Sequence, residues 1–119
     1  MRRSLLLALL LLAGCARLDI NAIGLHENVV KGGQTQIDQG KVVDVDGLPG
    51  VWLAGHHTTH GAVFARVTDL RVGDEVCVYS HCYHVTRWFD WCSHAFPGYL
   101  GPVVLQTSIP CGVRLVVAA

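Results

Sequence analysis

The sequence predicts a small all-β domain with one short helix. Glycines and the Pro49-Gly50 pair divide residues 16–50 into short segments, which is typical of strands joined by turns. Residues 75–79 alternate apolar and polar side chains, as in a strand with one buried face. The chain of 119 residues is long enough for one domain. Its formal net charge is zero and its basic residues form no tail or stripe, so we expect no nucleic-acid partner.

The first residues are typical of an export signal. Arg2 and Arg3 form a short positive region, and Leu5 through Ala13 form an apolar run too short to remain as a membrane-spanning helix. The run ends in Leu12-Ala13-Gly14-Cys15, which resembles a bacterial lipobox. This resemblance implies that Cys15 becomes lipid-modified and is the N-terminus of the processed protein.

The expected processing divides the chain into a lipoprotein-type signal peptide, residues 1–15, and one domain, residues 16–119. Two or more acyl chains on Cys15 would hold the domain stably at the extracytoplasmic face of the membrane. The alternative is an ordinary signal peptide with an incidental cysteine, which gives a secreted product.

The later elements follow one another as short segments. Residues 51–54 are an apolar run bounded by glycines, which predicts a buried strand. Residues 62–67 carry apolar side chains at helical spacing and predict the short helix. We expect a loop over residues 88–100 and strands over residues 103–107 and 113–117.

The cysteines predict two disulfides. With Cys15 lipid-modified, four cysteines remain in a small exported domain, and three connectivities are possible. The four are Cys77, Cys82, Cys92 and Cys111. Extended segments on either side of Ser80-His81 fit a hairpin, which would place Cys77 opposite Cys82 within bridging distance. That pairing would leave Cys92 with Cys111.

The seven histidines raise a zinc hypothesis. His56, His57 and His60 lie close together, and three imidazoles can hold a catalytic zinc ion. However, no carboxylate is near them in the sequence, and the segment is predicted to be a loop. We therefore expect no metal and no cofactor. Solvated loop residues are the simpler interpretation of His57, His60, His81 and His84.

An ordered motif begins in the predicted strand 51–54. Residues 52–64 read WLAGHHTTHGAVF, and residues 70–76 read LRVGDEV. Together they resemble the sortase family, most closely classes D, E and F, in which AGHR-x-x-HG-x-x-F precedes L-x-x-GDEV. Here His57 stands where arginine is usual. The resemblance implies a small closed β-barrel of the sortase type, and a partly open β-sandwich is the alternative.

The resemblance also marks candidate catalytic residues. His56, directly after Ala-Gly, corresponds to the family's catalytic histidine, and Arg114 to its catalytic arginine. We expect these two side chains to face each other across a groove. The position of the family's nucleophile, after residues 105–107, holds Ser108 instead of cysteine.

Two assignments stay open at this point. Cys111 is the thiol nearest to Ser108 in the sequence, and it either pairs with Cys92 or serves as the nucleophile. Four aromatic residues either line a short apolar groove or belong to the core. They are Trp88, Phe89, Trp91 and Phe96.

The resemblance implies a cysteine transpeptidase or hydrolase that acts on peptide sorting motifs at the cell envelope. In that chemistry a thiolate attacks the peptide carbonyl, the histidine protonates the leaving amine and the arginine stabilises the oxyanion. A serine hydroxyl is far less acidic than a thiol, so Ser108 supports an alternative, a catalytically inactive sortase-fold lipoprotein that binds a peptide or envelope partner. The expected partners are a peptide or protein substrate and the membrane, through the N-terminal lipid.

Overall fold

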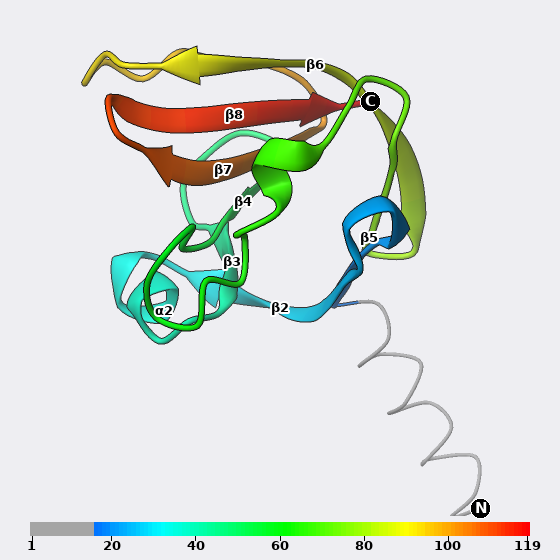
Figure 1. The fold of residues 1–119 in the computed structure, drawn as a ribbon, viewed down its shortest axis with the longest axis horizontal. Coiled ribbons are helices and arrows are strands. Elements are labelled where there is room, and N and C mark those ends of the chain that lie inside the picture. Colours follow the sequence, from blue (N-terminus) through cyan, green and yellow to red (C-terminus); the bar gives the residue numbers. More distant parts are fainter. Residues whose placement is uncertain (1–15) are drawn as a thin grey trace, which may run out of the picture.

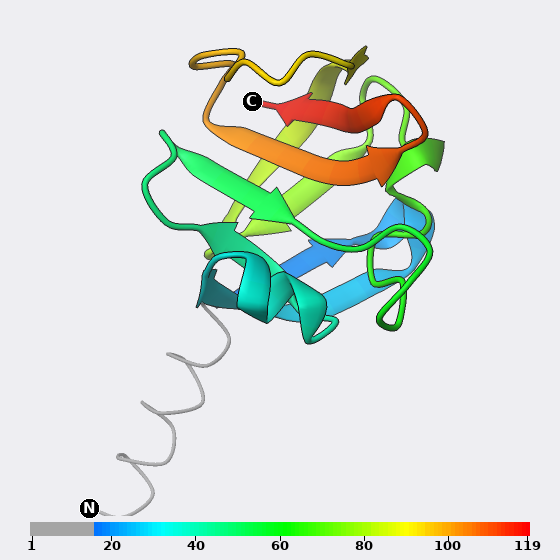
Figure 2. The ribbon, with the colours of Figure 1, turned by 90° about the vertical axis from the view of Figure 1, so that its left-hand side faces the viewer.

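The computed structural model describes residues 16–119, which form eight strands closed into a barrel (Figure 1, Figure 2). The strands are β1 (Arg17–Ile20), β2 (Leu25–Gly32), β3 (Val42–Val45), β4 (Val51–Ala54), β5 (Glu75–Val78), β6 (His81–Trp91), β7 (Val103–Ile109) and β8 (Gly112–Ala118). Around the barrel they run in the order β1-β2-β3-β4-β7-β8-β6-β5, and β5 pairs with β1. The closed barrel is therefore confirmed over the open sandwich.

Two of the strand pairs are parallel, and both matter for the site. β2 and β3 are parallel and are connected through a short helix, α2 (Gln34–Asp38). β4 and β7 are also parallel, with Ala54 opposite Gln106. Because parallel strands end at the same edge of a sheet, the segment after β4 and the C-terminal half of β7 lie next to each other.

The strands bury two apolar layers because their side chains alternate between faces. On β7, Val103 and Leu105 are fully buried in the main core, whereas Val104 belongs to a second cluster with Trp52 and Leu115. The main core also contains Leu18, Ile20, Leu53, Phe64, Val67, Val76, Val85 and Val116. The second cluster lies on the opposite face of the β4–β7–β8 part of the sheet.

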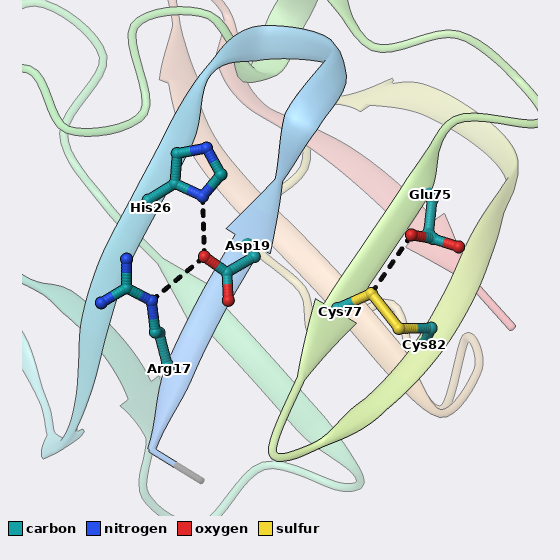
Figure 3. A network of polar contacts seen from close by, with 6 residues as sticks. All are labelled: Arg17, Asp19, His26, Glu75, Cys77 and Cys82. Carbon is teal, nitrogen blue, oxygen red and sulfur yellow. Dashed lines mark hydrogen bonds and ion pairs between the residues drawn. A yellow bond between two sulfur atoms is a disulfide. The ribbon is translucent and has the colours of Figure 1, made fainter. Parts of the chain in front are cut away.

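The hairpin predicted between residues 75 and 88 is confirmed. Tyr79 and Ser80 form its turn and both have positive φ, 53° and 64°, as a tight hairpin connection requires. Cys77 is opposite Cys82 in the strand register, and the two form a disulfide with Cα atoms 4.0 Å apart (Figure 3).

The neighbouring β1–β2 pair carries an exposed polar cluster (Figure 3). Asp19 accepts hydrogen bonds from His26 Nδ1 at 2.7 Å and from Arg17 Nε at 3.1 Å. Slight burial alone would raise the pKa of Asp19, but the hydrogen bonds from His26 and Arg17 outweigh it and lower the pKa.

The predicted position of the helix is wrong. The α-helix is α2, whereas residues 62–66 form turns that lead into a 3₁₀ helix, Val67–Asp69. Gly61 and Ala62 have φ of 85° and 48°, so the chain has left-handed geometry where a helix would begin. At α2 the Gln36 side chain accepts the Gly33 N–H at 2.9 Å, which stabilises the first turn.

The predicted loop over residues 88–100 is wrong in its first part. β6 continues to Trp91 because residues 88–91 pair with residues 113–116 of β8. The last strand pair is therefore long, and it presents the aromatic residues of β6 on two faces. Within residues 16–119 no helix is long and apolar enough to cross a membrane.

Candidate active site

His56 lies two residues after the end of β4. Its place depends on Gly55, where a Cβ atom would lie 2.8 Å from Val63 Cγ1 and 2.9 Å from Phe64 Cγ. The absence of that atom lets the following loop fold back, and the Phe64 N–H donates to the His56 carbonyl at 2.9 Å. The His56 side chain is consequently held at the edge of the barrel, with 19% of its surface exposed.

Both ring nitrogens of His56 have partners. Nε2 lies 2.8 Å from Asp38 Oδ1, and Nδ1 lies 3.1 Å from Thr59 Oγ1. Asp38 is the last residue of α2 and precedes His56 by 18 positions. The expectation that no carboxylate lies near the histidines is therefore wrong, because α2 folds against the loop after β4 (Figure 1).

Asp38 is itself oriented by its neighbours. Its Oδ1 also accepts a hydrogen bond from Gln34 Nε2 at 2.8 Å, one helical turn earlier. The hydrogen bond with His56, and then that with Gln34, lower the pKa of Asp38 despite slight desolvation. A carboxylate is thus fixed on one nitrogen of the candidate catalytic histidine. No motif or spacing in the sequence identifies Asp38 as a partner of His56.

Ser108 shares a small pocket with His56. The pocket has a volume of about 70 Å³, and its lining residues are Gln34, Ile37, Ala54, Gly55, His56, Gln106, Thr107 and Ser108. The buried Thr107 hydroxyl donates to the Gly55 carbonyl at 3.0 Å and so fastens β7 to the segment that carries His56. Among residues 16–119 no hydrogen bond joins Ser108 to His56.

Cys111 forms a disulfide with Cys92, and their Cα atoms are 5.2 Å apart. The bridge links the end of β6 to the β7–β8 turn. Together with the Cys77–Cys82 bridge it pairs every cysteine in the part of the chain that the structure describes. A thiolate from Cys111 requires reduction of this bridge first.

Arg114 lies on β8, and its side chain contacts β6. It forms an ion pair with Asp90, and its guanidinium carbon lies 4.1 Å from the centre of the Trp88 ring. The hydrogen bond from Arg114 lowers the pKa of Asp90. Arg114 is not among the residues that line the His56 pocket. The catalytic role that the resemblance implies for it stays a prediction.

The register of β7 with β8 decides which of their side chains share a face. Thr107 is opposite Arg114 and Ser108 is opposite Val113. Residues directly opposite each other share a face, and consecutive residues on one strand do not. Ser108 therefore faces the same side as Val113, whereas Arg114 faces the other side with Thr107.

An apolar groove of about 430 Å³ lies next to the small pocket. Its lining residues include Leu48, Trp52, Trp91, Phe96, Gln106, Val113 and Leu115. The Trp52 and Phe96 rings are 5.5 Å apart, and Trp52 Nε1 donates to Gln106 Oε1 at 2.7 Å. Gln106 lines both hollows, so the groove is adjacent to the pocket of His56 and Ser108.

The four aromatic candidates divide between two environments. Trp91 and Phe96 line the groove, and Phe89 packs edge-on against Trp91 with ring centres 6.4 Å apart. Trp88 lies under Arg114 on the other face. The groove interpretation thus holds for Trp91 and Phe96.

No protein-family model and no curated protein matches the sequence. Solved structures do match the fold. A Streptomyces coelicolor sortase E1 with a tripeptide in its active site is 21% identical, with 85% of this chain and 83% of that chain covered and a TM-score of 0.68. Sortase C1 from Streptococcus suis is 19% identical, with coverage of 87% and 69% and a TM-score of 0.73. Listeria monocytogenes sortase A is 16% identical, with coverage of 86% and 83% and a TM-score of 0.66.

The chain has the sortase fold. At these identities the likeness is one of fold.

Proposed function

We propose that this protein is a sortase-like transpeptidase or hydrolase that acts on an extended peptide at the cell envelope. One observation supports this most strongly: His56 and Ser108, which are far apart in the sequence, line one pocket that shares Gln106 with an aromatic groove. Such a groove suits a peptide with a bulky apolar side chain, and the pocket would receive the peptide bond that is cut.

In this proposal Ser108 is the nucleophile. Its Oγ attacks the peptide carbonyl carbon while its proton passes to His56. Collapse of the tetrahedral intermediate breaks the C–N bond, and His56 returns the proton to the leaving amine. A second amine, or water, then releases the acyl group from Ser108 by the reverse sequence.

Asp38 supplies what a serine nucleophile needs and a thiolate does not. A hydroxyl must lose its proton to a base during attack, and a carboxylate on the far nitrogen orients that base and stabilises its protonated form. Asp38 is bound to Nε2 of His56, which leaves Nδ1 for Ser108 once the Thr59 hydroxyl turns away.

The test is turnover of a library of fluorogenic peptides by the full-length chain in detergent, with both disulfides intact. We expect cleavage or transfer that persists after iodoacetamide treatment and is lost in Ser108→Ala. Activity that appears only with a reductant, and is lost in Cys111→Ala, would instead make Cys111 the nucleophile.

A second candidate function is peptide binding without catalysis. The Cys92–Cys111 bridge favours it, because Cys111, the cysteine nearest to Ser108 in the sequence, is held in a disulfide. In that case the groove captures a peptide or envelope partner. Library peptides that bind tightly but stay intact over long incubation, with equal affinity for Ser108→Ala, would support this function over the first.

The envelope location rests on the N-terminal segment, whose residues lie outside those that the structure describes. We propose that the Cys15 sulfur carries the lipid that anchors the domain. Cys15→Ser should remain as a precursor or become soluble, whereas the unmodified chain should fractionate with membranes and take up labelled fatty acid. An unlabelled chain that is cleaved elsewhere between Leu12 and Arg17 would mean an ordinary secreted protein.

A further inference from the structure

We propose that Asp38, His56 and His60 form a binding site for a divalent transition metal ion of the zinc type. Each of the three residues offers one ligand atom, and these atoms all lie within 4.8 Å of one another. Zinc ligands about 2.0–2.2 Å from the ion are roughly 3–3.6 Å apart in a tetrahedron, so small side-chain rotations would close the site.

Two separate segments bring the ligands together, the end of α2 and the loop after β4. Asp38 ends α2, His56 follows β4, and His60 lies in the loop beyond, with its ring stacked on that of His56 at 4.4 Å between centres. Gly40 makes this possible. A Cβ atom on Gly40 would lie 2.3 Å from the His60 carbonyl oxygen, and its φ of 80° also favours glycine.

The donor set suits the ion. Two imidazole nitrogens and one carboxylate oxygen are ligands that zinc accepts, and the fourth position would hold water. Asp38 and His60 are exposed and His56 is partly exposed, so an ion can enter from solvent. Gln34 already orients Asp38, and the Thr59 hydroxyl lies 3.1 Å from Nδ1 of both histidines. Such outer partners hold metal ligands in position.

His57, His81 and His84 do not belong to this cluster. His57 lies outside the cluster, with its Nε2 3.5 Å from the Thr68 hydroxyl. His81 and His84 belong to β6 and are also outside it. A second group, Glu75 with Cys77 and Cys82, offers no competing site while its cysteines are bridged.

Metal binding and the proposed catalysis would use the same imidazole. If the proposed function is correct, a bound ion would occupy His56 and suppress proton transfer. The binding itself does not depend on that function, and it is measured without peptide.

The test is calorimetric titration of the full-length chain in detergent with zinc chloride, without reductant. We expect one zinc ion per chain, and an affinity about tenfold or more weaker in His60→Ala and in Asp38→Asn, since even loss of an outer partner weakens metal sites by 10–100-fold. His57→Ala is the matched control and should bind zinc as the unmodified chain does.

Cobalt gives a second measurement on the same variants. Tetrahedral Co²⁺ should produce strong visible absorption in the unmodified chain and in His57→Ala, and this absorption should be lost in His60→Ala. The proposal is overturned by an absence of binding, by binding unchanged in both His60→Ala and Asp38→Asn, or by equal loss in His57→Ala. Far-ultraviolet circular dichroism verifies that each variant is folded.

Discussion

The two faces of the β7–β8 hairpin carry different parts of the sortase-like motif. On one face Ser108 lines a pocket with His56, and this pocket shares Gln106 with an aromatic groove. On the other face Arg114 binds Asp90 and stacks on Trp88. Strand alternation thus places Ser108 and Arg114 on different faces of this hairpin.

The difference teaches that a motif identifies residues but not the side they face. In this hairpin Ser108 is opposite Val113, and Arg114 is opposite Thr107. Because Thr107 and Ser108 are consecutive residues of one strand, Ser108 and Arg114 lie on different faces. A register shift of one residue would reverse that relation.

The largest expected effect is at Ser108. Under the proposed function, Ser108→Ala should lower kcat/KM by about 10³-fold or more, because the covalent step loses its nucleophile. Thr86→Ala is the matched control, since Thr86 lies on β6 and lines neither the groove nor the pocket of His56. Steady-state turnover of the best library peptide measures both. Equal rates for Ser108→Ala and the unmodified chain would contradict the role of Ser108 as the nucleophile.

The disulfides should differ in the stability that they contribute. The Cys92–Cys111 bridge closes a separation of 19 residues and the Cys77–Cys82 bridge one of 5. Loop-closure entropy predicts losses of about 3 and about 2 kcal/mol for the respective double alanine variants. Urea unfolding of the full-length chain measures both. A larger loss from the Cys77–Cys82 pair would contradict the ordering.

Arg114 tests the second face. From its stacking on Trp88, Arg114→Ala should lower the free energy of unfolding by about 0.5–1 kcal/mol. Because Arg114 does not line the pocket, we expect only a small change in turnover. Arg71→Ala, at an exposed position, is the control. A large loss of turnover with unchanged stability would return Arg114 to the catalytic role that the sequence resemblance implies.

The smallest effect concerns the pH dependence of the stability that the Arg114–Asp90 pair contributes. The hydrogen bond from Arg114 lowers the pKa of Asp90, so the ionised carboxylate favours the folded state. This contribution is present above the unfolded pKa of about 3.9 and is lost as pH falls through the lower folded value. Melting temperatures between about pH 2 and 6 should show a weaker acid dependence for Asp90→Asn. Added salt should reduce the difference, since the pair is partly exposed. Identical profiles at low salt would contradict the role of this pair.

Local features of the sequence were sufficient for much of the fold. Alternation over residues 75–79 and the turn that follows predicted the β5–β6 hairpin and the Cys77–Cys82 bridge, and they favoured the Cys92–Cys111 bridge. These features work because strand alternation and tight turns depend on neighbouring residues. The barrel was predicted through the ordered motif of residues 52–76. The position of the helix was not, since five residues give too weak a periodicity.

By itself, then, the sequence determined most of the strands, the Cys77–Cys82 pair, and His56 and Ser108 as residues of interest, and it left Cys111 open between a bridge to Cys92 and a nucleophile. Only the tertiary structure decided what surrounds them. Asp38 reaches His56 across 18 positions because α2 packs against the loop after β4. Arg114 faces away from Ser108 because of the β7–β8 register. Contacts between distant segments depend on packing and register of the whole barrel, and no local pattern of residues encodes them.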